Sequence, residues 1–286
     1  MSLSEWLLNY ETVIRLGSFL GIFVIMASLE TIFPRRKLTL SRWKRWLNNI
    51  SLVVLNTILL RLVFPAAAVG FVIFTEQQQW GLFNYYQLPF VLTIMISIVI
   101  LDLAIYLQHV MFHAVPVLWR LHRVHHADLD YDVTTGARFH PIEILLSMLV
   151  KFGVIGILGP PMVAVVLFEV ILNGMAMFNH SNFYLPERLD RVLRLFVVTP
   201  DMHRVHHSVE DDETNSNFGF NLPWWDRLFA TYKPQPDAGH KEMTIGIHHY
   251  RDPKLVDVLP GMLILPFVGK DGDYAINRRS WVKKDE

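Results

Sequence analysis

The chain has 286 residues, no net charge at pH 7 and no cysteine, and 52% of its residues are hydrophobic. This hydrophobic share exceeds what a soluble domain of this size carries, so we expect a membrane protein. The balanced charge gives no reason to expect nucleic acid as a partner. The lack of cysteine excludes disulfides, thiolate ligands and iron–sulfur clusters, and leaves histidine and carboxylate to bind any metal.

Three apolar stretches are long enough to cross a bilayer, which takes about 20 mostly apolar residues. We expect transmembrane helices over residues 12–33, 50–74 and 88–107. The N-terminus has neither a basic start nor a small-residue cleavage site, so we expect the first stretch to stay in the protein. A fourth stretch, residues 142–178, is interrupted at Gly159-Pro160-Pro161 and predicts a hairpin of two helices. Each half has about 18 residues, so the hairpin either crosses the bilayer or enters part of it.

Basic residues between the first two spans predict the orientation in the membrane. They are Arg35, Arg36, Lys37, Arg42, Lys44 and Arg45, in what the sequence predicts to be a short loop. The positive-inside rule places this loop in the cytoplasm. Residues 75–87 have no lysine or arginine and fall outside, so the third span returns to the cytoplasm. The C-terminus and the histidine-rich segments are then cytoplasmic.

The predicted fold is all-α, a multi-pass membrane bundle with a cytosolic cap of helices and loops. We divide the chain into residues 1–108, with the first three transmembrane helices; 109–141, with the first two histidine clusters of the cap; 142–178, the broken hairpin, transmembrane or re-entrant; and 179–286, with the third cluster and the C-terminal tail.

Three histidine clusters lie on the predicted cytoplasmic side. They are His109-x-x-x-His113, His122-Arg-Val-His125-His126 and His203-Arg-Val-His206-His207. On a helix, residues at i, i+3 and i+4 share a face, so each cluster can point several imidazoles at one spot. A lone His-x-x-x-His is a weak signal, but chance placement yields roughly 0.03 copies of His-x-x-His-His per chain. Two copies therefore favour metal binding over surface histidines or a pH-sensing patch.

The number of ligands predicts two metal ions. Eight imidazoles exceed the three or four that one zinc ion takes. Imidazole suits iron, zinc, copper and nickel alike, so the ligands by themselves leave the metal open.

The order and spacing of the clusters resemble the fatty acid hydroxylase superfamily, which includes sterol desaturases, sterol methyl oxidases and sphingolipid hydroxylases. Further blocks that are similar to this family are Arg138-Phe139-His140-Pro141-Ile142-Glu143, Thr199-Pro200-x-Met202-His203, Asn217-Phe218-Gly219 and Trp225-Asp226-Arg227-Leu228-Phe229-Ala230-Thr231-Tyr232. The resemblance covers roughly residues 95–235. Ala230 stands where we expect glycine, a departure that concerns packing rather than ligands.

The resemblance implies a membrane oxidoreductase with two iron ions in the cap. Molecular oxygen would be the cosubstrate, and a lipid-like molecule would be hydroxylated or desaturated: a sterol, fatty acyl chain, sphingoid base or ether lipid. His180 falls where family members supply a further histidine, so the resemblance makes it a ligand. A separate protein must donate electrons, because the chain shows no dinucleotide-binding glycine motif. The alternatives are a membrane zinc hydrolase, which needs no reductant, and a non-catalytic metal-binding membrane protein.

Several residues outside the clusters keep more than one interpretation. His140 is a ligand, a residue that orients one, or a residue at the membrane surface, and His240, His248 and His249 are expected in solvent. Metal-bound imidazoles usually donate their other N–H to a carboxylate or carbonyl, a role for which Asp102 is the first candidate and Asp128, Asp132 and Asp201 are others. Glu169 in the hairpin is either functional or paired with Lys151 or Arg61. The sequence leaves the oligomeric state open.

Overall fold

The computed structural model describes residues 3–65, 67–269 and 276, and within them the fold is all-α, as the sequence predicts. The elements in chain order are α1 (Leu3–Ile32), α2 (Arg42–Val63), α3 (Ala67–Gln77), α4 (Leu82–Tyr85), α5 (Phe90–Ala114), α6 (Pro116–His126), the 3-10 turn η1 (Thr135–Ala137), α7 (Pro141–Leu158), α8 (Met162–Asn179), α9 (Glu187–Leu193), α10 (Pro200–His206), α11 (Asp211–Thr214), α12 (Trp224–Leu228), α13 (Gly239–Glu242), α14 (Pro253–Val256), α15 (Leu259–Ile264) and the 3-10 turn η2 (Leu265–Phe267). The end of the predicted cap segment, residues 270–275 and 277–286, lies outside the described residues.

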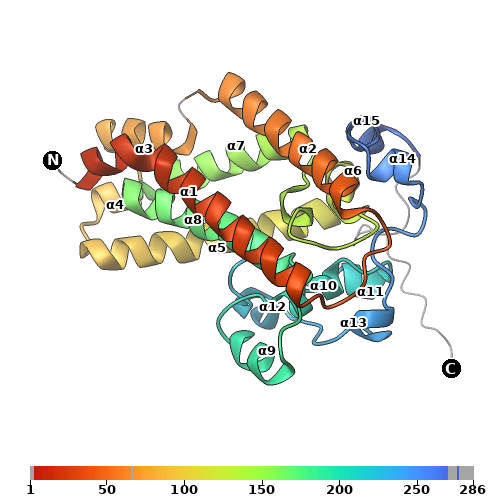
Figure 1. Ribbon diagram of the computed structural model, residues 1–286. Helices are drawn as coiled ribbons and strands as arrows, with labels where there is room; N and C mark the ends of the chain where they lie inside the picture. The colour runs from red at the N-terminus through yellow and green to blue at the C-terminus, as the bar shows by residue number, and fades with distance from the viewer. Residues whose placement is uncertain (1–2, 66, 270–275, 277–286) are drawn as a thin grey trace.

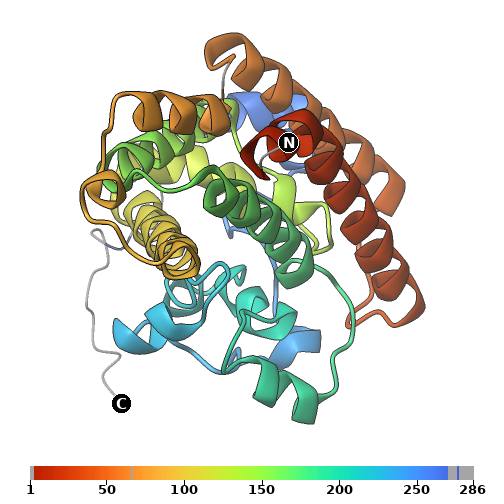
Figure 2. The same cartoon turned by 90° about the vertical axis from the view of Figure 1, so that its left-hand side faces the viewer.

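Long helices form a bundle, and the short helices α9 to α15 gather toward one end of it, whereas the short α4 lies at the other end (Figure 1). The helix α8 packs against α1, α3 and α5, and α7 packs against α2, α3 and α5. Figure 2 views the bundle from the end that carries the N-terminus, and α9 and α12 lie to one side of it in both views. The hairpin helices α7 and α8 therefore occupy the middle of the bundle.

Five stretches are long and apolar enough to cross a membrane: Glu5–Ile32, Arg42–Tyr85, Phe90–Ala114, Pro141–Leu158 and Met162–Asn179. The second of them includes residue 66, which lies outside the described residues. Large apolar side chains such as Val13, Val24 and Leu62 are exposed on these helices. Exposed apolar surface of this extent requires a lipid environment, so the chain is an integral membrane protein.

The second predicted span differs from the structure at both ends. We expected one helix over residues 50–74, but α2 begins at Arg42 and ends at Val63, before Pro65, and α3 starts at Ala67. Proline cannot donate a backbone hydrogen bond and clashes with the preceding turn, so the helix ends there. The earlier start places Arg42, Lys44 and Arg45 in a helix, which corrects the prediction of a loop.

The hairpin turns at the glycine and prolines that interrupt its sequence. Gly159 ends α7 in the left-handed conformation, with φ 60°, and Pro161 precedes α8. A Cβ atom on Gly159 would lie 2.4 Å from the carbonyl oxygen of Trp80, so a larger residue does not fit. Glycine at this position thus permits both the turn and its close contact with the segment after α3.

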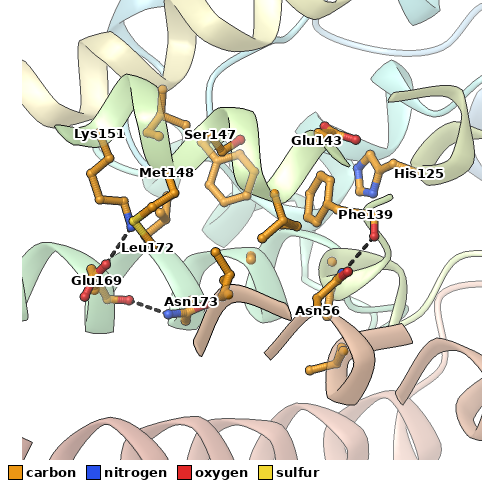
Figure 3. A pocket seen from close by; sticks show the side chains of 18 of the residues that line it. Asn56, His125, Phe139, Glu143, Ser147, Met148, Lys151, Glu169, Leu172 and Asn173 are labelled. Carbon is orange, nitrogen blue, oxygen red and sulfur yellow. Dashed lines mark hydrogen bonds and ion pairs between the residues drawn. The ribbon is translucent and has the colours of Figure 1, made fainter. Parts of the chain in front are cut away.

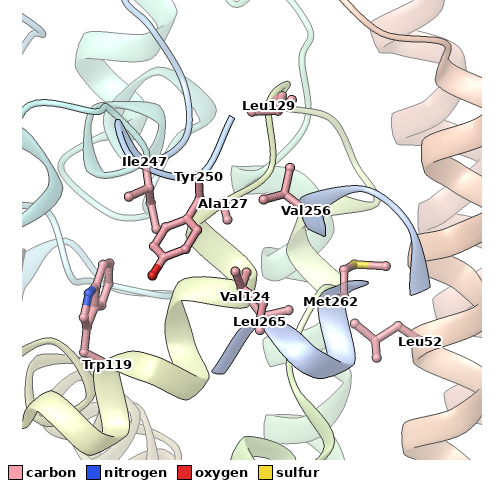
Figure 4. Packing of buried hydrophobic residues seen from close by; sticks show 10 residues of the cluster. All are labelled: Leu52, Trp119, Val124, Ala127, Leu129, Ile247, Tyr250, Val256, Met262 and Leu265. Carbon is pink, nitrogen blue, oxygen red and sulfur yellow. The ribbon is translucent and has the colours of Figure 1, made fainter. Parts of the chain in front are cut away.

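An apolar core joins the cap to the bundle (Figure 4). Its buried members are Leu52, Trp119, Val124, Ala127, Leu129, Ile247, Tyr250, Val256, Met262 and Leu265. They come from α2, α6, the loop after α6 and the last described segments. Burial of these side chains fixes α6, which carries the second histidine cluster, against η2, and the adjoining α15 packs on α2.

A buried ion-pair network holds the loop between α6 and α7. Arg45 donates to both carboxylate oxygens of Asp128, over 2.9 and 2.7 Å, and also pairs with Asp132. Arg138 pairs with Asp257 at 2.9 Å and lies 3.6 Å from Asp128. Burial opposes ionisation of Asp128, but Arg45 and Arg138 outweigh it and hold the pKa of this carboxyl below its usual value. Arg45 thus acts inside the protein, which corrects its assignment to a basic loop.

Replacing Arg45 should unfold the cap at lower temperature. Arg45→Met leaves Asp128 and Asp132 buried without their main partner, a loss of about 3 to 5 kcal/mol for a broken buried pair. Because the pKa of Asp128 is depressed in the folded state, this stabilisation is present above its unfolded value of 3.8 and is lost at lower pH. The difference from the unsubstituted protein should therefore be largest at neutral pH and shrink below about pH 4.

Thermal unfolding in detergent across this pH range measures the effect. Lys44→Met is the matched control, because Lys44 lies on the same helix turn and is exposed. Equal unfolding temperatures for the two variants at neutral pH would contradict the structural role of Arg45.

Candidate metal centre

The histidine clusters lie at helix ends on the cap side of the bundle. His109 and His113 lie near the end of α5, and the second cluster ends α6. The third cluster lies on α10, where the Thr199 hydroxyl accepts a hydrogen bond from the backbone N–H of Met202. Thr199 thus caps α10, and Pro200 lies in its first turn. His180 follows the last residue of α8.

The structure brings nine histidines together in two groups whose ligand atoms lie within 4.8 Å of one another. The first group is His109, His113, His122, His126 and His206; the second is His125, His180, His203 and His207. All the members of both groups are buried. Every histidine of the three clusters is included, and so is His180.

The groups do not follow the sequence clusters, contrary to the expectation that each cluster points at one spot. His122 and His126 belong to the first group, whereas His125 belongs to the second. The reason is helical geometry, since neighbouring residues point about 100° apart and residues four apart share a face. A His-His pair therefore supplies one imidazole to each group.

In the first group, two imidazole nitrogens face each other with no proton between them. His109 Nδ1–H donates to the carbonyl oxygen of Phe218 at 2.8 Å. His206 Nδ1–H donates likewise to Ser216 at 2.7 Å. A neutral imidazole has one N–H, so both Nε2 atoms carry lone pairs, yet they lie 2.9 Å apart. Such a contact is repulsive unless a cation lies beside both nitrogens.

The second group has the same arrangement. His180 Nδ1–H donates to the carbonyl oxygen of Ala176 at 2.7 Å, so its Nε2 carries a lone pair. That atom lies 3.2 Å from His125 Nε2 and 3.1 Å from His203 Nε2. Nitrogens bound to one metal at about 2.0 to 2.1 Å lie a little over 3 Å apart, so these distances fit a shared ion.

Burial keeps the imidazoles of the cap neutral. Desolvation lowers the pKa of His122 and of His180 to about 3. It also lowers the pKa of His203 and His207 well below the usual value, and the neighbouring histidines add to this effect. The neutral ring is the form that binds metal, so the groups need no proton release to accept an ion.

The loop after α11 positions the first group through its backbone. Asp226 accepts hydrogen bonds from the N–H groups of Phe218 and Gly219, each at 2.8 Å. A Cβ atom on Gly219 would lie 2.5 Å from this carboxylate. Asp226 therefore fixes the loop segment whose carbonyl groups orient His109 and His206. This contact explains why Asn217-Phe218-Gly219 and Asp226 occur together in the sequence.

Glu143 is the carboxylate that orients a cluster histidine. Its Oε1 accepts a hydrogen bond from His122 Nδ1 at 2.6 Å. In the sequence, Glu143 stands in one of the blocks similar to the family, and its spacing assigns it no role. The signal that could have identified it is its position three residues after His140, at the start of α7.

The arginine within each His-Arg-Val-His-His copy holds its cluster in place through contacts with neighbouring segments. Arg123 donates to the carbonyl oxygens of Leu265 and Val268 and lies over the ring of Tyr250. Arg204 pairs with Asp201 and lies over the ring of Tyr131. Both arginines are fully buried. Their partners are carbonyl groups, a carboxylate and aromatic rings, which gives the repeated arginine of the motif a structural role.

The remaining candidates lie outside both groups. His140 caps α7 by accepting from the N–H of Ile142, and its Nε2 lies 3.3 Å from the carbonyl oxygen of Leu263. Asp102 accepts from Trp225 Nε1 at 2.8 Å and supports the same loop as Asp226.

The three other acidic candidates form ion pairs with arginines, and one histidine outside the clusters lies beside one of these carboxylates. Asp128 and Asp132 pair with Arg45, and Asp201 with Arg35 and Arg204. His240, expected in solvent, is buried 3.6 Å from Asp201, which corrects that prediction.

A bundle of apolar helices that ends in two buried groups of imidazoles defines a histidine-rich metalloprotein of the membrane. A family model described as fatty acid hydroxylase matches residues 94–231. The match covers just under half of the chain and confirms the predicted resemblance to this superfamily, together with the prediction of an oxidoreductase.

Relatives of this chain have names that describe lipid hydroxylation. It is 26% identical over 235 residues to the ornithine lipid hydroxylase OlsE of Rhizobium tropici, covering 79% of this chain and 69% of that protein. It is 28% identical to the alkylglycerol monooxygenase of Homo sapiens, covering 52% and 31%. For the cholesterol 25-hydroxylase of Rattus norvegicus the identity is 25%, covering 51% and 48%. The chain thus spans less than half the length of the latter two. No solved structure matches it.

Substitution of one histidine in each group tests the two-ion arrangement. His206→Ala and His125→Ala should each leave about one tightly held metal ion per chain, and the double variant almost none, because each removes a nitrogen from a different group. Metal analysis after dialysis against a weak chelator gives the counts. His248→Ala is the control, since His248 is exposed and lies outside both groups. Unchanged metal content in both single variants would rule out the assignment.

Proposed function

We propose that the protein is an oxygen-dependent hydroxylase that acts on a lipid-like substrate with two iron ions. The observation that carries the proposal is that imidazoles of both groups, His109, His122 and His125, line one end of a cavity of about 300 Å³. The cavity lies among apolar helices long enough to cross a membrane, so an apolar substrate can reach the metal centre from the bilayer.

The nine histidines would hold the metals, five around one ion and four around the other. When bound, iron supplies the oxygen chemistry that converts an unactivated C–H bond into an alcohol. The overall reaction takes a C–H bond, O₂, two electrons and two protons to an alcohol and water. The names of the relatives support hydroxylation over desaturation.

The residues of this chain bind, orient and exclude water. The carbonyl groups of Ser216 and Phe218 and the carboxylate of Glu143 fix the tautomers of three imidazoles, so that Nε2 points at the metal. Phe139 stacks on His125, with ring centroids 4.5 Å apart, and covers the cavity side of the second group. The electrons come from a separate donor protein.

Oxidation of membrane lipids by the purified protein tests the proposal. Protein in lipid nanodiscs, loaded anaerobically with ferrous iron and given a reductant, should consume oxygen and yield lipid products that have gained one oxygen atom. The double variant His125→Ala/His206→Ala should do neither, because it lacks a ligand of each ion. Mass spectrometry and an oxygen electrode provide the readouts. A stable zinc pair with no oxygen uptake would instead support a hydrolase.

We also propose that the cap faces the cytoplasm, on the basis of the basic residues between α1 and α2. The chain has no cysteine, so single cysteines can be introduced for labelling. In intact cells, an impermeant thiol reagent should label Tyr85→Cys but not Asp237→Cys, which lies in the cap. Asp237→Cys should react only after the membrane is permeabilised. Asp237 and Tyr85 suit this test because their side chains are 76% and 79% exposed. The reverse labelling pattern would show that the cap lies on the opposite side of the membrane and would contradict the proposed orientation.

A further inference from the structure

The cavity beside the metal centre extends along α7 into the bundle (Figure 3). Glu143 and His125 lie at one end of it, and Lys151 and Glu169 lie at the other. Glu143 and Lys151 are eight residues apart on one helix, which separates them by about 12 Å. The cavity therefore has two chemically different ends, one with imidazoles and one with charged side chains.

The charged end joins three helices. Lys151 on α7 pairs with Glu169 Oε1 on α8 at 2.5 Å, and Arg15 on α1 pairs with Glu169 Oε2 at 3.1 Å. Arg15 also pairs with Glu11, one turn earlier, at 3.0 Å. The partner of Glu169 is thus Lys151, as the sequence suggests, together with Arg15 rather than Arg61. We call Arg15, Lys151 and Glu169 the charged cluster.

The charged cluster lies where charge is costly. All three residues belong to stretches able to cross a membrane, in which ionisable side chains are rare and mark ligand pathways. A buried pair that serves stability alone can often be replaced by apolar residues at no loss. Stability alone therefore does not account for the burial of Glu169 with two cations, and a role in binding a ligand is the further explanation.

The cations of the cluster have donors left for a ligand. A lysine ammonium carries three N–H donors and an arginine guanidinium five. The contacts with Glu169 and Glu11 use few of them in the described part of the chain. The side chain of Arg15 is 30% exposed and that of Lys151 13%, and both line the cavity. A hydrocarbon tail at this end would desolvate these charges without compensation, whereas an oxygen atom would accept from them.

We propose that the charged cluster binds the polar end group of the substrate. The substrate class is then an amphiphilic lipid whose oxygen-bearing end group lies about 12 Å from the carbon presented to the imidazoles, with hydrocarbon between them. This inference rests on the proposed function for the identity of the site as catalytic. Binding itself depends on residues of the cavity alone, so it can be measured without turnover.

A photoactivatable fatty alcohol tests this binding mode. The probe is a long-chain alcohol with a diazirine in mid-chain, added to the protein in nanodiscs, and the crosslinked peptides are mapped by mass spectrometry. With the hydroxyl group at the charged cluster, the diazirine should label the metal end of the cavity, around Phe139 and Ile144. The corresponding alkane with the same diazirine should label these residues about tenfold less, because it lacks the hydrogen bonds to charged donors.

The double variant Lys151→Met/Glu169→Gln removes the pair and leaves Arg15 with Glu11. It should lower the preference for the alcohol over the alkane several-fold, because the ammonium donors of Lys151 are lost, while metal content and unfolding temperature stay unchanged. Lys241→Met/Glu242→Gln makes the same chemical change at two exposed positions of α13 and should keep the preference.

The outcomes separate this inference from the proposed function. An unchanged preference for the alcohol in the double variant overturns the inference. A loss of bound metal together with an equal loss of crosslinking by both probes also overturns it, because the cluster would then serve the stability of the fold. Site-specific labelling that depends on the pair, without oxygen uptake by the iron-loaded protein, supports the binding site and contradicts the hydroxylase.

Discussion

The close approach of unprotonated imidazole nitrogens is the constraint on which the rest of the structure depends. His109 and His206 present lone pairs to each other at 2.9 Å, because each has given its N–H to a backbone carbonyl. Rotating either ring would relieve the repulsion but would leave a buried carbonyl without a donor, at a cost of about 1 to 3 kcal/mol. The arrangement is therefore set to receive a cation, and the surrounding protein fixes it before the ion binds.

Much of the cap can be understood as support for this arrangement. The loop that supplies the carbonyl groups is fixed by Asp226, which Thr231 also contacts at 2.7 Å. Asp102 contacts the same loop through Trp225 and so links it to α5, the helix that carries His109. The buried arginines Arg45 and Arg138 hold the loop after the second cluster. Each support is polar and buried, so each depends on its partner, and loss of one partner would leave the other buried without a hydrogen bond.

The sequence predicts the ligands better than their grouping. Spacing identifies the three clusters, because i, i+3 and i+4 repeats are rare by chance. Helical geometry separates neighbouring histidines such as His125 and His126, but it does not show which histidines of the other helices each one meets. That grouping depends on how α5, α6, α8 and α10 pack. Asp102 shares a helical face with His109, yet its carboxylate accepts a hydrogen bond from Trp225, more than a hundred residues later in the chain, which spacing does not show. The orienting carboxylate, Glu143, comes from another helix. The helix break at Pro65 differs from these cases. It was not predicted either, but its signal, a proline within the apolar stretch, is local and could have been used.

The helix α7 connects the metal centre to the depth of the bundle. It begins at the cap of His140, orients His122 through Glu143, and reaches Lys151 eight residues later. With 18 residues it is about 27 Å long, close to the thickness of the hydrocarbon core of about 30 Å. Because one rigid helix carries both Glu143 and Lys151, the distance between the two ends of the cavity is fixed. The charged cluster can therefore act as a stop that decides which carbon of a bound chain lies beside the imidazoles, whereas a cavity with apolar ends would let the chain slide.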